Sequence, residues 1–305
     1  MPNEIPTKQN SLELMRLIYA YHQAYANANQ LAILRFGLVT AIALVVPLFG
    51  AFVPVFRPYG ALMSLAMFLL DLFYFEKQID HDRRLGAKLQ ELFDRTLFGL
   101  SWPENIVGEK PTFEVVGALS AKYAAILKPE RQNKLQNWYP TQIENLQKPI
   151  AVLICQRSNC VWDADLRKTY VRILYAGILL LMAVGALVAI LLKMTVPDFL
   201  LTFTVPTLPA IAFVWRVALS QTEAISSSHR TRRALDSVRQ TAMANKYSAD
   251  VLDAHIDYLQ AEIFDRRSTI SRVPAIIYDR YREKLEGEMK QAVDSMIADA
   301  SETVV

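Results

Sequence analysis

The sequence predicts an all-α integral membrane protein with four transmembrane helices, arranged as two hairpins. A helical cytoplasmic body is built from its N-terminal, central and C-terminal segments. The 305 residues are 52% hydrophobic yet include 33 Lys or Arg and 30 Asp or Glu, so apolar and charged residues must lie in different segments. Residues 36–56 and 173–192 carry no charged side chain, and about 20 apolar residues cross the hydrocarbon of a bilayer. Two shorter runs, residues 58–75 with Asp71 inside and residues 199–215, also predict spans.

The other elements follow in chain order from helical spacing and from helix breakers. Asn10, followed three residues later by Glu13, predicts the capping box of a first helix that continues into the first span. The glycines and prolines of GLSWPENIVGEKP predict a break in the cytoplasmic helices. The expected segments are an N-terminal helix (1–30), a first transmembrane hairpin (31–75), a cytoplasmic sensing segment (76–170), a second hairpin (171–219) and C-terminal cytoplasmic helices (220–305).

The distribution of basic residues predicts the orientation, because segments rich in Lys and Arg stay on the cytoplasmic side. Residues 76–170 contain 14 Lys or Arg and residues 220–305 contain 12, whereas the connections at 54–57 and 193–197 contain one each. Both termini and the central segment are therefore expected in the cytoplasm. The first thirty residues lack the pattern of a cleaved signal peptide, so the first span is expected to remain in the protein.

The positions of the cysteines and the absence of known catalytic motifs predict a protein without a cofactor, a metal or an enzymatic site. Cys155 and Cys160 fall in the segment expected in the reducing cytoplasm, and no histidine lies near them at a zinc-site spacing. The sequence contains no phosphate-binding Gly-Lys loop, no dinucleotide fingerprint and no zinc-protease helix in the required context. An enzyme is accordingly the least favoured class.

The stretch ICQRSNCVWDADLRKTY, residues 154–170, precedes the third span and carries groups that an anionic nucleotide needs. Arginines supply positive charge, aromatic rings can stack on a base, and amide or carboxylate groups supply directional hydrogen bonds. The candidates for ligand binding or coupling are Gln156, Arg157, Asn159, Trp162, Asp163 and Arg167, together with Trp138 and Tyr139 of the NWYP motif. The alternative is that Asp163 caps a helix, Trp162 lies at the membrane interface and the basic residues only set the topology.

Small and polar residues within the spans are candidates for a pore or for helix packing. Gly177 and Gly185 lie on one face of the third span, where small residues permit close helix approach. Thr204 and Thr207 flank Pro206 in the fourth span, and a proline there frees backbone carbonyls inside the bilayer. Such a polar, interrupted helix is typical of one that lines a cavity.

Asp71 in the second span is a functional candidate because an ionisable group within a membrane helix is costly. It lies five residues from the end of that span. Pairing with Arg35 near the cytoplasmic boundary is therefore an equally good interpretation.

Four stretches resemble one known family: IPTKQN, NKLQNWYP, ICQRSNCVWDADLRKTY and YLQAEIFDRRSTISRVPAIIYDRYREKLEGEMK. The chain resembles the four-transmembrane effectors associated with nucleotide second-messenger synthases (SMODS) in bacterial anti-phage CBASS operons. The resemblance implies a cytoplasmic body that responds to a cyclic oligonucleotide, and a membrane part that opens or disrupts the bacterial inner membrane. The small face of the third span and the Thr and Pro residues of the fourth also predict a homo-oligomer, and no binding of nucleic acid polymers is expected.

Two other classes compete with a ligand-gated membrane effector. A receptor or scaffold could bind a cytoplasmic partner protein through the helical body without conducting, and this is the main alternative. A membrane-bound enzyme is disfavoured because the sequence contains neither a metal set nor a nucleophile set.

Overall fold

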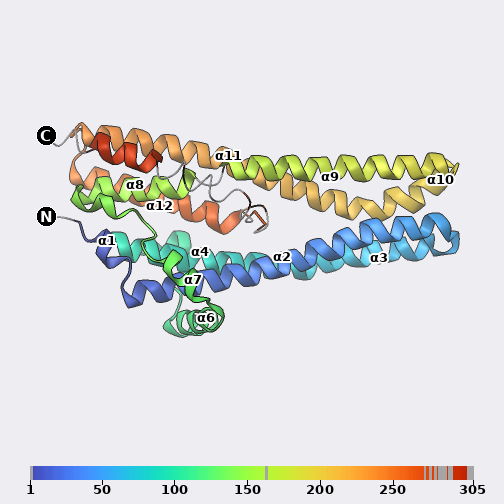
Figure 1. Ribbon diagram of the computed structural model, residues 1–305, viewed down its shortest axis with the longest axis horizontal. Coiled ribbons are helices and arrows are strands. Elements are labelled where there is room, and N and C mark those ends of the chain that lie inside the picture. The colour runs from blue at the N-terminus through green and yellow to red at the C-terminus, as the bar shows by residue number, and fades with distance from the viewer. Residues whose placement is uncertain are drawn as a thin grey trace. The chain divides into compact units, whose positions relative to one another are not determined.

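The computed structural model describes residues 3–161, 164–270, 273–274, 277, 280, 287 and 291–300. Helices and their connecting turns account for these residues, and no strand occurs among them (Figure 1). The chain divides into two compact units. Unit 1 comprises Met1–Ala26, Asp82–Leu166 and Ala224–Val305, and unit 2 comprises Asn27–His81 and Arg167–Glu223.

The boundaries between the units fall inside four helices: α2 (Leu12–Phe52), α4 (Glu76–Phe98), α9 (Ala164–Leu191) and α11 (Val205–Met243). Unit 2 also contains the 3₁₀ turn η1 (Pro54–Phe56), α3 (Arg57–Leu70), the π-helical segment η2 (Asp71–Phe75), α10 (Val196–Phe199) and a second π-helical segment, η5 (Leu200–Thr204). Unit 1 also contains α1 (Ile5–Lys8), α5 (Glu104–Val107), α6 (Phe113–Ile126), α7 (Pro129–Gln132), the 3₁₀ turns η3 (Asn133–Leu135) and η4 (Thr141–Asn145), α8 (Lys148–Val161) and α12 (Ala249–Thr269).

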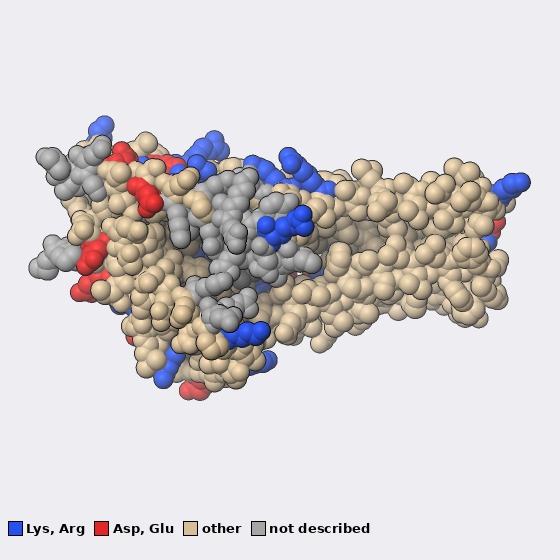
Figure 2. All heavy atoms as spheres, in the orientation of Figure 1, with Lys and Arg blue, Asp and Glu red and all other residues tan. Residues whose placement is uncertain are grey.

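Four helical stretches of the described chain are long and apolar enough to cross a membrane, which confirms the predicted number of spans. They are Leu12–Phe52, Pro54–Phe98, Leu166–Leu191 and Val196–Met243. Unit 2 holds only eight of the 33 Lys and Arg residues, and the face of it drawn in Figure 2 carries charged side chains almost only at its ends. Only 11% of the apolar window of the third stretch is buried, so α9 exposes apolar side chains around most of its surface.

In unit 2, α2 and α3 form one hairpin and α9 and α11 the other (Figure 1). At the turns, Arg57 pairs with Asp198 of the other hairpin, and its Nε donates to the carbonyl of Gly50 at 3.1 Å. Further along the spans, the hydroxyl of Ser64 donates to the carbonyl of Pro206 at 3.2 Å. These polar contacts fix the position of one hairpin along the other, which apolar side chains alone do not specify.

Asp71 lies in a cluster of four charges within unit 2. Its carboxylate accepts from Arg35 Nη2 at 2.7 Å and from Arg216 Nη2 at 3.1 Å, and Arg216 Nη1 also pairs with Glu76 at 3.1 Å. The guanidinium of Arg35 lies 4.4 Å from the centre of the Phe213 ring. Two arginines and two carboxylates sum to zero charge. The structure thus confirms the predicted pairing of Asp71 with Arg35.

The first long helix begins one residue later than the predicted capping box requires. Ser11 precedes α2, and its hydroxyl accepts from the amide of Leu14 at 3.5 Å. Asn10 instead exchanges two hydrogen bonds with Asn137, of 2.8 and 3.0 Å. The prediction that Asn10 caps this helix is therefore wrong, because a partner 127 residues away takes its side chain.

We expect Asp71→Asn to destabilise unit 2 by about 3 kcal/mol, because Arg35 would remain buried without its anion. Glu76→Gln is the matched control. The Glu76 side chain is 40% exposed, so its loss should cost less than about 1 kcal/mol. Thermal unfolding of the purified protein in detergent measures both effects. Equal midpoints for the two variants would show that the buried charge cluster does not hold the unit together.

Candidate functional site in the polar core of unit 1

Helix α8 carries three of the eight predicted ligand residues, Gln156, Arg157 and Asn159, and it lies in the interior of unit 1. Every residue from 150 to 158 is buried. Apolar residues on this helix, from Ile150 to Cys155, belong to the main core together with residues of α2, α4, α11 and α12. The polar residues that follow them, beginning at Gln156, are therefore placed against the other helices of the unit.

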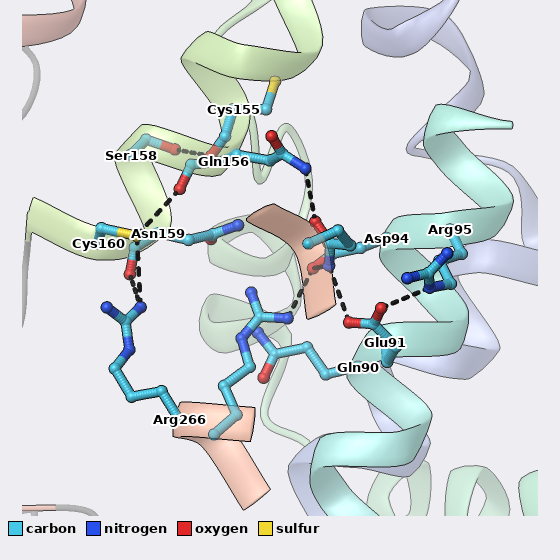
Figure 3. A network of polar contacts seen from close by, with 12 residues as sticks. Gln90, Glu91, Asp94, Arg95, Cys155, Gln156, Ser158, Asn159, Cys160 and Arg266 are labelled. Carbon is cyan, nitrogen blue, oxygen red and sulfur yellow. Dashed lines mark hydrogen bonds and ion pairs between the residues drawn. The ribbon is translucent and has the colours of Figure 1, made fainter. Parts of the chain in front are cut away.

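The centre of the polar core is a pair of carboxylates on α4, Glu91 and Asp94, which are 0% exposed (Figure 3). Arg95 Nε donates to Glu91 at 2.5 Å, and Arg267 Nη1 donates to Asp94 at 2.6 Å. The amide of Gln260 donates to Glu91 at 2.8 Å. Two arginines and one amide from α4 and α12 thus compensate two buried negative charges.

Burial and the neighbouring negative charge of Asp94 raise the pKa of Glu91 from its ordinary 4.5 to about 7. The positive charges of Arg267 and Arg95 act in the opposite direction but do not cancel the cost of burial. Glu91 therefore exchanges its proton near neutral pH.

Tyr139 connects this carboxylate pair to α8 and to the N-terminal segment. Its hydroxyl donates to Asp94 at 2.7 Å and accepts from the amide of Asn159 at 2.8 Å. Its backbone exchanges two hydrogen bonds with the side chain of Gln9, of 2.8 and 3.1 Å. Burial, followed by the charge of Asp94, raises the pKa of Tyr139 well above its ordinary value, so the hydroxyl stays protonated.

The next side chains of α8 bind α11 and α12. Gln156 Nε2 donates to the carbonyl of Ile256 at 3.0 Å and to Gln260 Oε1 at 3.1 Å. Arg157 pairs with Asp236 of α11. The amide nitrogen of Gln156 and the guanidinium of Arg157 therefore already have intramolecular partners.

Arg266 of α12 joins the same network near the C-terminal end of α8 (Figure 3). Its guanidinium donates to Ser228 Oγ at 3.0 Å and to the carbonyl of Asn159 at 3.3 Å, and contacts Cys160 Sγ at 3.5 Å. Cys155 and Cys160 are both free and buried, and burial raises the pKa of Cys155 well above its ordinary value. A buried, protonated thiol is a packing group rather than a nucleophile.

A groove adjoins the polar core at the C-terminal end of α4. Lys148, Asp253 and Asp257 supply its charged lining, and Phe98 and Pro149 supply apolar surface. Arg95 connects this groove to the core, because its Nη1 donates to Asp257 while its Nε holds Glu91. The groove thus offers a cation, carboxylates and apolar surface to a small polar molecule.

The described parts of the chain contain no group of three or more His, Cys, Asp or Glu residues that could hold a metal ion. The structure brings together four of the predicted residues, Tyr139, Gln156, Arg157 and Asn159, in unit 1. Trp138 is 38% exposed in the same unit, near the rings of Tyr21 and His22. Arg167 lies in unit 2 and binds Gln221 there, whereas Trp162 and Asp163 lie outside the described residues.

The profile of the SMODS-associating 4TM effector domain matches residues 3–296. The chain belongs to this effector family. It is similar to a probable CBASS effector molecule of Bacillus cereus (strain VD146), with 22% identity over 220 residues that cover 69% of this chain and 71% of the relative. No solved structure matches.

The membrane candidates of this effector occupy different environments within unit 2. A Cβ atom on Gly185 would lie 3.3 Å from the ring of Phe203, whereas one on Gly177 would meet nothing within 4 Å. Thr207 is buried, and its hydroxyl donates to the carbonyl of Phe203 at 2.6 Å in its own helix. Thr204 is half-buried. Gly185 therefore serves packing inside one copy, and Gly177 lies on an open surface of α9.

Sequence reasoning missed the residues at the centre of the effector's polar core: Glu91, Asp94, Arg95, Gln260, Arg266 and Arg267. One signal was present in ELFDR, residues 91–95. Glu91, Asp94 and Arg95 are three and four residues apart and share one helix face, while Phe93 points elsewhere into the core.

The raised pKa of Glu91 predicts a pH dependence of stability. Between about pH 4.5 and 7 the folded effector holds a proton that the unfolded chain releases, so the free energy of unfolding falls as the pH rises through this range. The full effect is roughly 3 kcal/mol. Glu91→Gln does not titrate and should lose less stability than the wild type between pH 5 and 8.

Unfolding midpoints at pH 5 and pH 8 measure this difference. Glu114→Gln is the control, because hydrogen bonding lowers the pKa of the exposed Glu114 and places its titration below this range. Parallel pH profiles for the wild type and Glu91→Gln would contradict the prediction.

Proposed function

We propose that this protein is a membrane effector of a bacterial anti-phage CBASS system, in which unit 1 binds a cyclic oligonucleotide and unit 2 then permeabilises the inner membrane. The family and its relative, a probable CBASS effector molecule, support the defence role. Unit 1, with both termini, faces the cytoplasm in this proposal. Its support is the concentration of Lys and Arg outside unit 2. The partners are the nucleotide, the bilayer and further copies of the chain, without a nucleic acid polymer.

The observation that carries the proposal is that the polar core of unit 1 includes side chains from helices that also build the membrane unit. Glu91, Asp94 and Arg95 belong to α4, and Ser228 and Asp236 belong to α11. Both helices contribute residues to unit 2. A ligand that rearranges these polar contacts changes the packing of helices whose continuations are transmembrane.

The groove beside the polar core is our proposed binding site. A cyclic oligonucleotide carries several phosphate charges, which Lys148 can approach, and its bases carry N–H groups that Asp253 can accept. Arg95 is the link to the core, since it holds both Asp257 at the groove and Glu91. A ligand that competes for Asp257 would therefore shift Arg95 and change its contact with the buried Glu91.

Arg157 acts as a coupling residue in this proposal. Its side chain is 10% exposed and paired with Asp236, so a ligand could use Arg157 only by breaking that pair. The pair ties α8 to α11, the helix that continues into the fourth span. Arg157 thereby holds the sensing helix in register with a membrane helix.

Arg157→Ala should leave nucleotide affinity within about three-fold of the wild type, a change below 1 kcal/mol, and abolish depolarisation. Folding should persist because Asp236 is 30% exposed and lies 3.9 Å from Arg232. Arg232→Ala is the matched control and should depolarise normally. Lys148→Ala should weaken binding roughly ten-fold, the loss of one charge-assisted contact.

Calorimetry on detergent-purified protein measures binding, and a potential-sensitive dye in cells supplied with candidate cyclic nucleotides measures depolarisation. Binding that Arg157→Ala weakens more than ten-fold would make Arg157 a direct ligand contact. Binding by the wild type without any depolarisation would favour the non-conducting receptor and contradict the proposed effector mechanism.

The fourth span is our proposed lining of the opening. Replacing Thr204 and Thr207 together with Leu should reduce depolarisation strongly, because two polar groups beside the interrupted segment η5 would be lost. Thr204→Ser with Thr207→Ser is the matched control, because it keeps both hydroxyls and should depolarise normally. Membrane-potential recordings on both double variants, with insertion checked first, test this. Undiminished depolarisation with Leu would point to another lining or to disruption without a pore.

A further inference from the structure

Helix α6 exposes an apolar face although it belongs to the charged unit. Twelve of its 14 residues are uncharged, and the two charged residues are Glu114 and Lys122. The ends carry large exposed side chains, with Phe113 93% and Ile126 66% exposed. The exposed positions of one face are Glu114, Gly117, Ala118, Ala121, Lys122 and Ala125, at the spacing i, i+3, i+4, i+7, i+8 and i+11.

The opposite face fixes α6 to unit 1. Tyr123 is buried, its ring stacks on His22 at a centroid distance of 5.4 Å and lies 5.8 Å from Tyr19. Val116 and Leu119 pack against the main core. The helix is capped by Thr112, whose hydroxyl accepts from the amide of Val115 at 3.5 Å. The exposed face therefore belongs to a docked helix at the edge of the unit (Figure 1).

Side chains on the exposed face are small between the two charges. A Cβ atom on Gly117 would meet no described atom within 4 Å, and alanines occupy positions 118, 121 and 125. Two helices approach closely where the residues between them are small. Such a face fits another helix better than it fits a small ligand.

The charges on this face are complementary under two-fold symmetry. Glu114 and Lys122 lie four residues on either side of Ala118, about 6 Å along the helix axis in each direction. Antiparallel pairing of two identical helices across an axis at Ala118 places each Glu114 opposite a Lys122 of the second copy. Parallel pairing would instead place like charges beside each other.

We propose that α6 is a self-association surface, at which two copies of this protein pack antiparallel across a two-fold axis at Ala118 with Glu114 of each copy paired to Lys122 of the other. A contact of one helix per copy is small, so it is weak between free molecules. Two copies held in one membrane meet at a high effective concentration, which makes a weak contact sufficient. The proposal does not depend on the nucleotide or on the opening of a pore.

Disulfide cross-linking of the full-length protein in membranes tests the proposal. Ala118→Cys places one new thiol per copy at the axis, and the natural Cys155 and Cys160 are buried. Oxidation should produce covalent dimers. Ala254→Cys, on an exposed position of α12, is the matched control and should produce few. Equal dimer yields at the two positions would overturn the proposal. An Ala118→Cys thiol that is shielded from water but forms no dimers would also overturn it, because such a thiol is buried in lipid.

Charge reversal in the Ala118→Cys background tests the pairing itself. Glu114→Lys or Lys122→Glu alone replaces two attractions by two repulsions and should lower the dimer yield roughly ten-fold. The double reversal should restore it. A mixture of the two single variants, carrying different tags, should cross-link between variants and not within each. Single reversals without effect, or a mixture without mixed dimers, would overturn the pairing.

Glu114→Lys also places a positive charge in the first turn of α6, which weakens the helix. A loss of dimers in Glu114→Lys alone therefore does not separate a weakened helix from a lost ion pair. The Lys122→Glu variant, whose change lies in the second half of the helix, separates the two effects. Normal thermal unfolding of Lys122→Glu together with lost dimers is the result that supports the proposal.

Discussion

Two carboxylates that cannot reach water determine how unit 1 is assembled. Glu91 and Asp94 lie one turn apart on α4, and their compensation takes Arg95 from the same helix and Arg267 from α12. Removal of one member of such a set leaves an unpaired buried charge, which costs more than the intact set contributes. The buried charges therefore fix which helices must lie together, while the apolar side chains around them supply most of the driving force.

The same polar core holds three residues of the predicted binding stretch in contacts within unit 1. Gln156, Arg157 and Asn159 are residue types that bind nucleotides, yet each side chain contacts another part of unit 1. A ligand that bound these side chains would have to replace contacts that they already make within unit 1. The proposal accordingly separates a groove that receives the nucleotide from a helix that transmits its arrival, and the pair of Arg157 with Asp236 is the transmitting contact.

Unit 2 follows other rules because lipid replaces water around it. Its charged contacts lie near the ends of the spans, with Arg57 and Asp198 at the turns and Asp71 at the other end. Between these ends, the hydroxyl of Ser64 donates a hydrogen bond to the carbonyl of Pro206 across the hairpins. The proposed opening would require the two hairpins to exchange contacts such as this one.

The number of spans and the all-α fold were predictable, since uncharged runs of about 20 residues leave little alternative. The pairing of Asp71 with Arg35 was predictable as one of two options from its position near a span end. The buried role of α8 was not, because a helix covered on all sides shows no amphipathic period. Contacts such as that of Asn10 with Asn137 join residues that are far apart in the sequence, so local sequence patterns do not predict them.

The roles proposed for the predicted site residues stay predictions, and the sequence does not reveal where these residues lie. Tyr139 and Gln156 could not be placed from sequence, because polar residues before a membrane helix look alike whether they face solvent or a core. Sequence alone also gave no signal for the groove, since Lys148 and Asp253 are 105 residues apart and each resembles an ordinary surface charge. The central claim is that nucleotide binding to unit 1 opens unit 2.

Ion leakage from liposomes that contain only the purified full-length protein tests that claim most directly. Vesicles are loaded with potassium, and the membrane potential is followed with a dye while single cyclic oligonucleotides are added. The account predicts rapid loss of the potential with at least one cyclic oligonucleotide and none with its linear form or with mononucleotides. A protein that is folded, inserted and shown to bind the nucleotide, but leaves the potential unchanged, would contradict it.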